Sequence, residues 1–198
     1  MNKGRDTRTA QYPVDDLFID RWSPRAMSGE SISPEELFSL FEAARWAPSS
    51  GNSQPWRMVY AHRDSASWPR FFDVLAEGNR LWCANAAVLV VVVSQTMREG
   101  TDKPLSTHSY DTGAAWASLA LQGWMRGLAV RGMGGFDYAK AKTSLGIPDG
   151  YRVEAMIAIG RRGTPEDLPE SLRARETPTS RLPVSALVFE GEFGVTPA

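Results

Sequence analysis

Blocks of hydrophobic and polar residues follow one another along the chain and predict a series of strands and helices. The run from Ala87 to Val93 is apolar throughout and mostly β-branched, which predicts a strand buried on both faces. Trp56 to Ala61, Ala129 to Met133 and Val153 to Ile159 predict three further strands. No internal repeat and no linker interrupts the pattern, so we expect a single domain over residues 1–198.

Helical spacing is clearest in two segments. Ser33 to Glu36 has the sequence of a capping box with proline at the first helical position, and it opens a helix that runs to about Trp46. The segment from Ser109 to Arg126 is apolar nearly all round and stops at Gly127, so it must be buried in the core or against another chain. Shorter helices are predicted at Val14 to Ile19, at Trp68 to Ala76 with its end at Gly78, at Asn79 to Ala84, and at Tyr138 to Leu145 with Asp137 as its cap.

Other segments are predicted to be irregular. Met1 to Gln11 is polar, and we expect it to be loosely ordered. Arg98 to Pro104 is charged and reads as an exposed loop, and Gly163 to Ala174 as a loop with a short, weak helix. The chain closes with an apolar tail from Leu187 to Phe193.

The segment from Ala47 to Trp56 stands out by its polarity and its two prolines. Pro48 and Pro55 fix φ and lack an N–H group, so no regular element can run through it. Gly51 permits backbone shapes that other residues avoid. The remaining positions offer short side chains that donate or accept hydrogen bonds: Ser49, Ser50, Asn52, Ser53 and Gln54. Taken alone, the segment fits either a binding loop or a capped surface connection.

Two further segments have residues suited to binding, each with a plainer alternative. Arg21-Trp22-Ser23-Pro24-Arg25 places two guanidiniums and a hydroxyl within five residues, which could clamp a phosphate or could be two solvated surface arginines. Gly134-Gly135 after a predicted strand would let the backbone approach a ligand closely, or form a simple turn.

Composition and missing motifs exclude several classes of function. The net charge of −1 argues against nucleic acid or an anionic membrane as main partner, and 42% apolar residues suffice for a full core. A single cysteine, Cys83, excludes an intrachain disulfide and fits a reducing compartment, so we expect a cytoplasmic protein. With only two histidines we expect no structural metal site, and no signal core or membrane span is recognisable.

No nucleophile or dinucleotide motif is recognisable either. The chain lacks a G-x-G-x-x-G fingerprint, a P-loop and a G-x-S-x-G elbow. His108, Ser109 and Asp111 are close in sequence, but we interpret Asp111 or Ser109 as a helix cap rather than part of a catalytic triad. Cys83 sits among apolar residues and is interpreted as a buried structural thiol.

Together these segments resemble the FMN-dependent nitroreductase family over nearly the whole chain. The resemblance rests on Arg21-x-Ser23-x-Arg25, the capped helix, the block from Ala44 to Trp56, the Gly134-Gly135-Phe136 turn and the late Arg181, in the family's order and spacing. It implies an α+β fold with a central mixed sheet flanked by helices and a C-terminal extension, in a homodimer with FMN at the interface.

The resemblance also implies roles for particular residues. Arg21, Ser23 and Arg181 would hold the FMN phosphate, while Arg25 would lie near the flavin's N1 and C2 carbonyl. The loop from Pro48 to Asn52 would reach the flavin of the other subunit. Asn79 would bond the pyrimidine edge, and the glycine turn would lie near N5. The full set of cofactor-binding residues implied is Arg21, Trp22, Ser23, Arg25, Pro48, Ser49, Ser50, Asn52, Gln54, Asn79, Met133, Gly134, Gly135 and Arg181.

Two positions depart from the family pattern. Thr179 stands where many relatives have a lysine two residues before the late arginine. Gly134 stands where many have an acidic residue just before the glycine of the turn. The positive charge around the phosphate and the reduction potential of the flavin would therefore differ from those of better-known members of the family.

The function implied is reduction of electron-poor acceptors such as nitroaromatics or quinones, with NADH or NADPH as electron donor, by a ping-pong mechanism. The flavin would carry the chemistry, so no protein residue is assigned as catalytic acid or base. Two alternatives stay open: a flavin-binding storage or sensor protein without turnover, and nicotinamide-independent flavin chemistry such as reductive dehalogenation.

Overall fold

Strand β2 (Val88–Gln95) is buried on both faces, as the sequence predicts. In the computed structural model, which describes residues 3–195, the side chains of Val88, Val90 and Val92 belong to one hydrophobic cluster. Those of Leu89, Val91 and Val93 belong to the other. Because successive side chains of a strand point to opposite faces, β2 lies at the centre of two cores.

The sheet has the strand order β1-β2-β4-β3, where β1 is Trp56–His62, β4 is Tyr151–Arg161 and β3 is Leu128–Met133. All three strand pairs are antiparallel, and a bulge between Val92 and Val93 interrupts the pairing of β2 with β4. The expected α+β class with a central sheet and flanking helices is confirmed. Within the described chain, however, the sheet is antiparallel rather than mixed.

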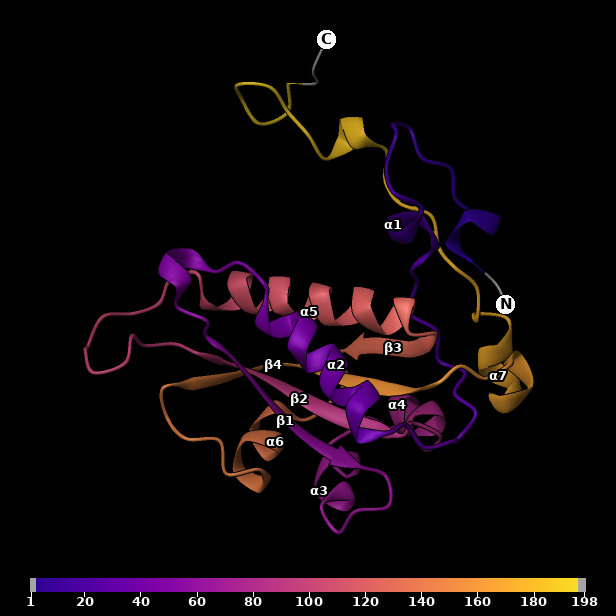
Figure 1. The fold of residues 1–198 in the computed structure, drawn as a ribbon, viewed down its shortest axis with the longest axis horizontal. Coiled ribbons are helices and arrows are strands. Elements are labelled where there is room, and N and C mark those ends of the chain that lie inside the picture. The colour runs from indigo at the N-terminus through magenta and orange to yellow at the C-terminus, as the bar shows by residue number, and fades with distance from the viewer. Residues whose placement is uncertain (1–2, 196–198) are drawn as a thin grey trace. The chain divides into compact units, whose positions relative to one another are not determined.

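Helices cover both faces of this sheet (Figure 1). On one face, α2 (Pro34–Arg45) packs against α5 (His108–Met125), and both contribute to the core that contains Val88. On the other face lie α3 (Trp68–Phe72), α4 (Glu77–Cys83) and α6 (Tyr138–Ser144), around Leu89. The larger unit therefore has three layers, with helices on each face of the sheet and a hydrophobic core on each side.

Local signals explain where most helices begin and end. Ser33 and Glu36 form the predicted capping box of α2, and the Asp137 carboxylate accepts the N–H of Lys140 at the start of α6. Gly127 follows α5 with φ +73°. One prediction is wrong: Gly78 lies inside α4 instead of ending the helix before it, since its φ is not in the left-handed region and α3 stops at Phe72.

The described chain forms two compact units. The larger unit, Ser23–Glu176, contains the sheet, its flanking helices and α7 (Glu170–Arg173). The smaller unit joins the two chain ends, residues 3–22 and 177–195, and includes α1 (Asp16–Asp20). That the whole chain acts as one domain stays a prediction.

The smaller unit is held by specific polar contacts. Arg5 forms ion pairs with Asp16 and with the buried Asp20, at 2.7 and 2.6 Å. The side-chain oxygen of Gln11 accepts the backbone N–H of Val184 at 2.7 Å. The expectation of a loosely ordered start is therefore wrong for the described residues before Tyr12, because charged and amide side chains fix them to partners elsewhere in the unit.

The contact between α5 and β3 depends on Gly123. A Cβ there would overlap the Val130 side chain and lie 3.3 Å from Leu40. Overpacking of this kind costs about 1–3 kcal/mol, which exceeds the gain of up to about 1 kcal/mol from alanine's helix propensity. We therefore expect Gly123→Ala to lower the free energy of unfolding, measured by urea denaturation of the apoprotein.

The matched control is Gly78→Ala in α4, where a Cβ would meet nothing within 4 Å. We expect this variant to be neutral or stabilised by up to about 1 kcal/mol. Equal stabilities of the two variants would contradict close packing of α5 against β3.

Candidate functional site

The polar loop after α2 is strained and largely exposed. Gly51, Asn52 and Gln54 all have positive φ, at 56°, 54° and 47°. Two of these are not glycine, and such backbone strain persists only where the surroundings hold it in place. The Ser49 hydroxyl oxygen accepts the N–H of Gln54 at 3.0 Å, and the Gln54 amide donates to the Asn52 carbonyl at 3.0 Å.

Asp111 of α5 holds the loop from outside. Its side chain is buried, and one carboxylate oxygen accepts the N–H of Ser50 at 3.1 Å and the Thr107 hydroxyl at 2.9 Å. The prediction that Asp111 or Ser109 caps the helix is wrong. Thr107 is at the N-cap, and the Ser109 hydroxyl donates to Glu154 at 2.6 Å. The Asp111 carboxylate therefore binds the loop instead of capping the first N–H groups of α5.

A buried glutamate fixes the opening motif in the larger unit. Oε1 of Glu176 accepts the backbone N–H groups of Arg25 and Ala26, at 2.7 and 2.8 Å. Its Oε2 is buried without a hydrogen-bond partner in the described residues. Arg131 of β3 donates to the Ser23 carbonyl. The segment that contains Ser23 and Arg25 is therefore held by a carboxylate on one side and a guanidinium on the other.

Positive charge accumulates around this glutamate. Burial lowers the pKa of Arg131 to about 10, with the positive charge of Arg25 acting in the same direction. Burial also lowers the pKa of Arg25, and Glu176 partly offsets this. The Arg131 guanidinium lies 5.6 Å from the Trp82 ring centroid, a cation–π distance. Both arginines remain charged at neutral pH, so this region favours an electron-rich or anionic ligand group.

The glycine turn after β3 contacts α4. The Asn79 side chain donates to the Gly135 carbonyl at 2.8 Å and accepts from the Trp82 indole at 3.2 Å. A Cβ at Gly135 would lie 2.8 Å from the Asn79 amide nitrogen, so the close approach requires glycine. Met133 is buried beside Cys83, with its sulfur 3.8 Å from the thiol. Cys83 is buried as predicted, and burial raises the pKa of its thiol.

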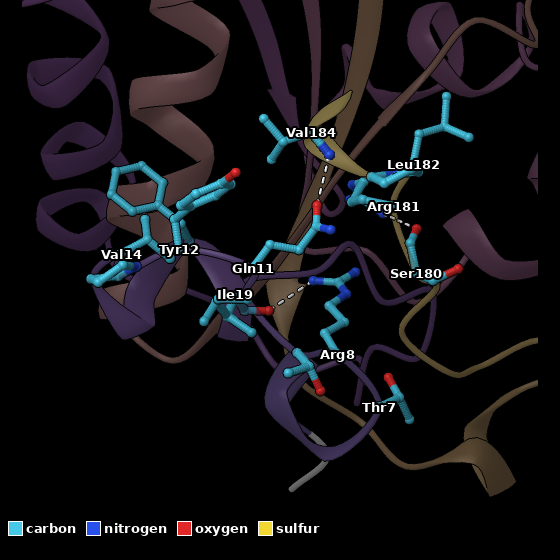
Figure 2. Close-up of a pocket in the computed structure, with 15 residues that line it drawn as sticks. Thr7, Arg8, Gln11, Tyr12, Val14, Ile19, Ser180, Arg181, Leu182 and Val184 are labelled. Carbon is cyan, nitrogen blue, oxygen red and sulfur yellow. Dashed lines mark hydrogen bonds between the residues drawn. The ribbon is translucent and has the colours of Figure 1, made fainter. Parts of the chain in front are cut away.

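The smaller unit contains a second group of arginines, Arg8, Arg21 and Arg181. Burial and the charge of Arg181 lower the pKa of Arg21. Arg8 and Arg181, together with Ser180, line a cavity of about 700 Å³ (Figure 2). Clustered guanidiniums of this kind fit a phosphate dianion, which would relieve their mutual repulsion.

The structure brings some predicted site residues together and separates others. Arg21 lies near Arg181, and Asn79 contacts Gly135. Within the larger unit, the loop at Ser50–Asn52 lies beyond one end of α5, whereas α4 and α7 lie toward the other end (Figure 1). One copy of the larger unit therefore does not place the loop beside Asn79. Among the other predicted positions, Trp22 and Ser23 are half-buried, and Pro48 and Gly134 are exposed.

Comparison with known proteins decides the family. The model of the nitroreductase family matches residues 19–81 and 73–161, more than half of the chain. The chain belongs to the nitroreductase family. A relative from Archaeoglobus fulgidus, provisionally named an NADH dehydrogenase/NAD(P)H nitroreductase, is 28% identical over 164 residues, covering 78% of this chain and 88% of its own length.

Solved structures of nitroreductase-family and related proteins agree with this assignment. The crystal structure of an oxidoreductase containing FMN is 47% identical, covers 96% of this chain and 97% of its own, and has a TM-score of 0.91. A nitroreductase from Desulfovibrio desulfuricans in complex with FMN has a TM-score of 0.72, with 93% and 99% coverage. At 24% identity, the latter supports the fold alone.

Four residues of the candidate site were missed by sequence reasoning. Arg8, Asp111, Arg131 and Glu176 each act on a site segment that is distant in sequence. The only local signal was a charged residue in an otherwise apolar stretch, as for Arg131 within β3 and Asp111 at the start of α5.

No group of three or more histidine, cysteine, aspartate or glutamate side chains within residues 3–195 is arranged to hold a metal ion. Among the helices of this part of the chain, none is long and apolar enough to span a membrane.

The Glu176 contacts predict a large difference between two substitutions. Glu176→Ala leaves two backbone N–H groups without their acceptor, and we expect it to lower the free energy of unfolding by about 1–3 kcal/mol. Glu176→Gln keeps a side-chain oxygen for both donors, so its loss is expected to be clearly smaller. Urea denaturation of the three proteins measures this, and an alanine variant as stable as wild type would contradict the role of the carboxylate.

Proposed function

We propose that this nitroreductase-family protein is an FMN-dependent oxidoreductase that uses NADH or NADPH to reduce electron-poor acceptors such as nitroaromatics or quinones. The observation that carries the proposal is the 47% identity, over nearly the full length of both chains, to an oxidoreductase containing FMN. The nicotinamide donor is supported by the provisional name of the Archaeoglobus fulgidus relative.

Each unit contains residues that fit one part of FMN. Arg21 and Arg181 form a cationic group suited to the phosphate, and Ser23 follows Arg21 in the same motif. In the larger unit, Arg25 supplies positive charge. Gly135 has no side chain, so the turn beside Asn79 leaves room for a close approach of a ligand. When bound, FMN would supply the redox chemistry that links the nicotinamide donor to the acceptor.

The protein's own contribution is binding, orientation and electrostatics. Arg25 and Arg131 keep their charge in a partly dehydrated environment, where it is worth more than in water. Positive charge near the pyrimidine edge favours the reduced, more negative cofactor. We assign no side chain as proton donor or acceptor.

We propose that the active species is a homodimer in which the loop from Pro48 to Asn52 serves the partner's cofactor. Two observations support this arrangement. The loop and α4, the helix that contains Asn79, lie toward opposite ends of α5 (Figure 1). In addition, α5 exposes large apolar side chains, with Tyr110 82% and Met125 61% exposed, which a second chain would cover.

An absorbance spectrum followed by anaerobic titration tests the function. We expect purified protein, reconstituted with FMN, to be yellow and to bleach when NADH or NADPH is added, with colour restored by a quinone or a nitroaromatic. Protein that retains FMN after dialysis but is not bleached by either nicotinamide would support a binding protein or nicotinamide-independent chemistry instead. Failure to retain FMN at all would overturn the proposal.

The shared site predicts a difference between two mixed dimers that carry the same two substitutions. With Asn52→Ala and Arg21→Ala on separate chains, one site is intact and the other carries both defects. We expect this dimer to keep about half of the wild-type activity. With both substitutions on one chain and the other chain wild type, each site carries one defect, and activity should fall substantially further.

The comparison is controlled because both dimers contain the same changes, so differences in folding stability should be small. The two homodimeric single variants establish first that each substitution impairs turnover. Equal activity of the two mixed dimers would then show that the loop does not serve the partner's cofactor.

A further inference from the structure

Arg8 connects the two arms of the smaller unit through backbone carbonyls. Its Nη1 donates to the carbonyls of Ile19 and Arg21, at 2.8 and 2.9 Å, and its Nε donates to the carbonyl of Thr179 at 2.7 Å. We call residues 3–22 and 177–195 the two arms of this unit; they contain Arg21 and Arg181, respectively. The Arg8 guanidinium therefore contacts backbone carbonyls of both arms. These bonds use Nε and Nη1, and within residues 3–195 its Nη2 donates no hydrogen bond.

No carboxylate of residues 3–195 forms an ion pair with Arg8. Within the described chain, Arg8 and Arg181 donate only to neutral oxygens: backbone carbonyls and, for Arg181, also the Thr179 hydroxyl. Burial, together with the charges of Arg181 and Arg21, lowers the pKa of Arg8. The nearby Arg5 differs, since it pairs with Asp16 and Asp20. Arg8 therefore adds to the positive potential at Arg21 and Arg181.

We propose that Arg8 is a third phosphate-binding arginine, which adds its charge to Arg21 and Arg181 and aligns their two arms so that all three guanidiniums meet one phosphate dianion. Figure 2 shows the Arg8 and Arg181 side chains on the wall of the same cavity. The assignment rests on the proposed function, because it takes the phosphate to be that of FMN.

A purely structural role for Arg8 makes a different prediction. If Arg8 only tied the two arms together, its loss would displace Arg21 and Arg181, and a positive charge introduced elsewhere would not restore FMN binding. If Arg8 also binds the phosphate, its loss weakens the binding of FMN more than that of riboflavin, which has the same ring and side chain without the phosphate, and a new positive charge restores part of the loss. The ratio of the riboflavin dissociation constant to the FMN dissociation constant, measured with and without the added charge, separates the two roles.

The experiment measures both dissociation constants on apoprotein by quenching of flavin fluorescence. Arg8→Gln removes the charge and keeps a donor, and Arg8→Lys keeps the charge and loses the planar fork. Arg5→Gln is the matched control, because it removes an arginine of the same unit whose charge is already paired. Arg21→Ala is the reference for loss of a phosphate contact.

A rescue variant tests charge directly. The Thr179 hydroxyl lies 3.3 Å from Nη1 of Arg181, so a lysine at this position would place an ammonium group beside that guanidinium. We expect Arg8→Gln to reduce the ratio at least tenfold and Arg8→Lys to reduce it two- to fivefold. Thr179→Lys in the Arg8→Gln background should restore a large part of the loss, and Arg5→Gln should stay within twofold of wild type.

The outcomes separate the two proposals. A wild-type protein that binds neither flavin, or binds both equally, overturns the proposed FMN function and the role of Arg8 with it. A wild type that prefers FMN, with Arg8→Gln leaving the ratio unchanged, overturns the role of Arg8 alone. If Arg8→Gln does not fold, the ratio for Arg8→Lys decides, and a value equal to that of wild type counts against the proposal.

Discussion

A single buried carboxylate closes the larger unit on itself. Glu176 is the last residue of that unit, and it accepts backbone N–H groups from Arg25 and Ala26, 151 and 150 positions earlier. Every strand and every helix that covers the sheet lies between these two points. Since backbone donors buried without an acceptor are costly, the segment with Ser23 and Arg25 keeps its position only while this oxygen is present. Arg131 offsets the buried negative charge and fixes the Ser23 carbonyl.

Local concentrations of charge, rather than overall composition, suit this chain to the anionic cofactor that we propose. The net charge of −1 argues against nucleic acid or an anionic membrane as main partner, but it does not indicate a particular small ligand. Yet arginines gather in two places, around Glu176 in the larger unit and at Arg21 and Arg181 in the smaller one. Acidic side chains neutralise other arginines, such as Arg5 and Arg161, within their own units. The distribution places carboxylate-paired arginines and clusters of like-charged arginines at different positions within each unit.

The sequence predicted what depends on near neighbours. The burial of β2 on both faces, the capping box at Ser33 and the cap at Asp137 were all predicted, because each involves residues within a few positions. Motif resemblance predicted the family and the α+β fold, whereas the site residues that it implies stay predictions. It could not reveal Asp111 or Glu176 as the groups that hold those segments, because each contact joins positions 61 or more apart. The prediction that Gly78 ends a helix failed although it used near neighbours only. A glycine inside a short helix cannot be told by sequence from a glycine that ends one.

The smaller unit has a consequence for the order in which the molecule is made. Its two parts are the chain up to Trp22 and the chain from Thr177 onward, and Arg8 is separated from its acceptor on Thr179 by 171 positions. On the ribosome the first part emerges well before the second, because the whole larger unit lies between them in the sequence. The larger unit can close once Glu176 has appeared. Arg21 and Arg181 therefore meet only after the larger unit has been synthesised, so under the proposed function the cofactor's phosphate can be bound only after that step.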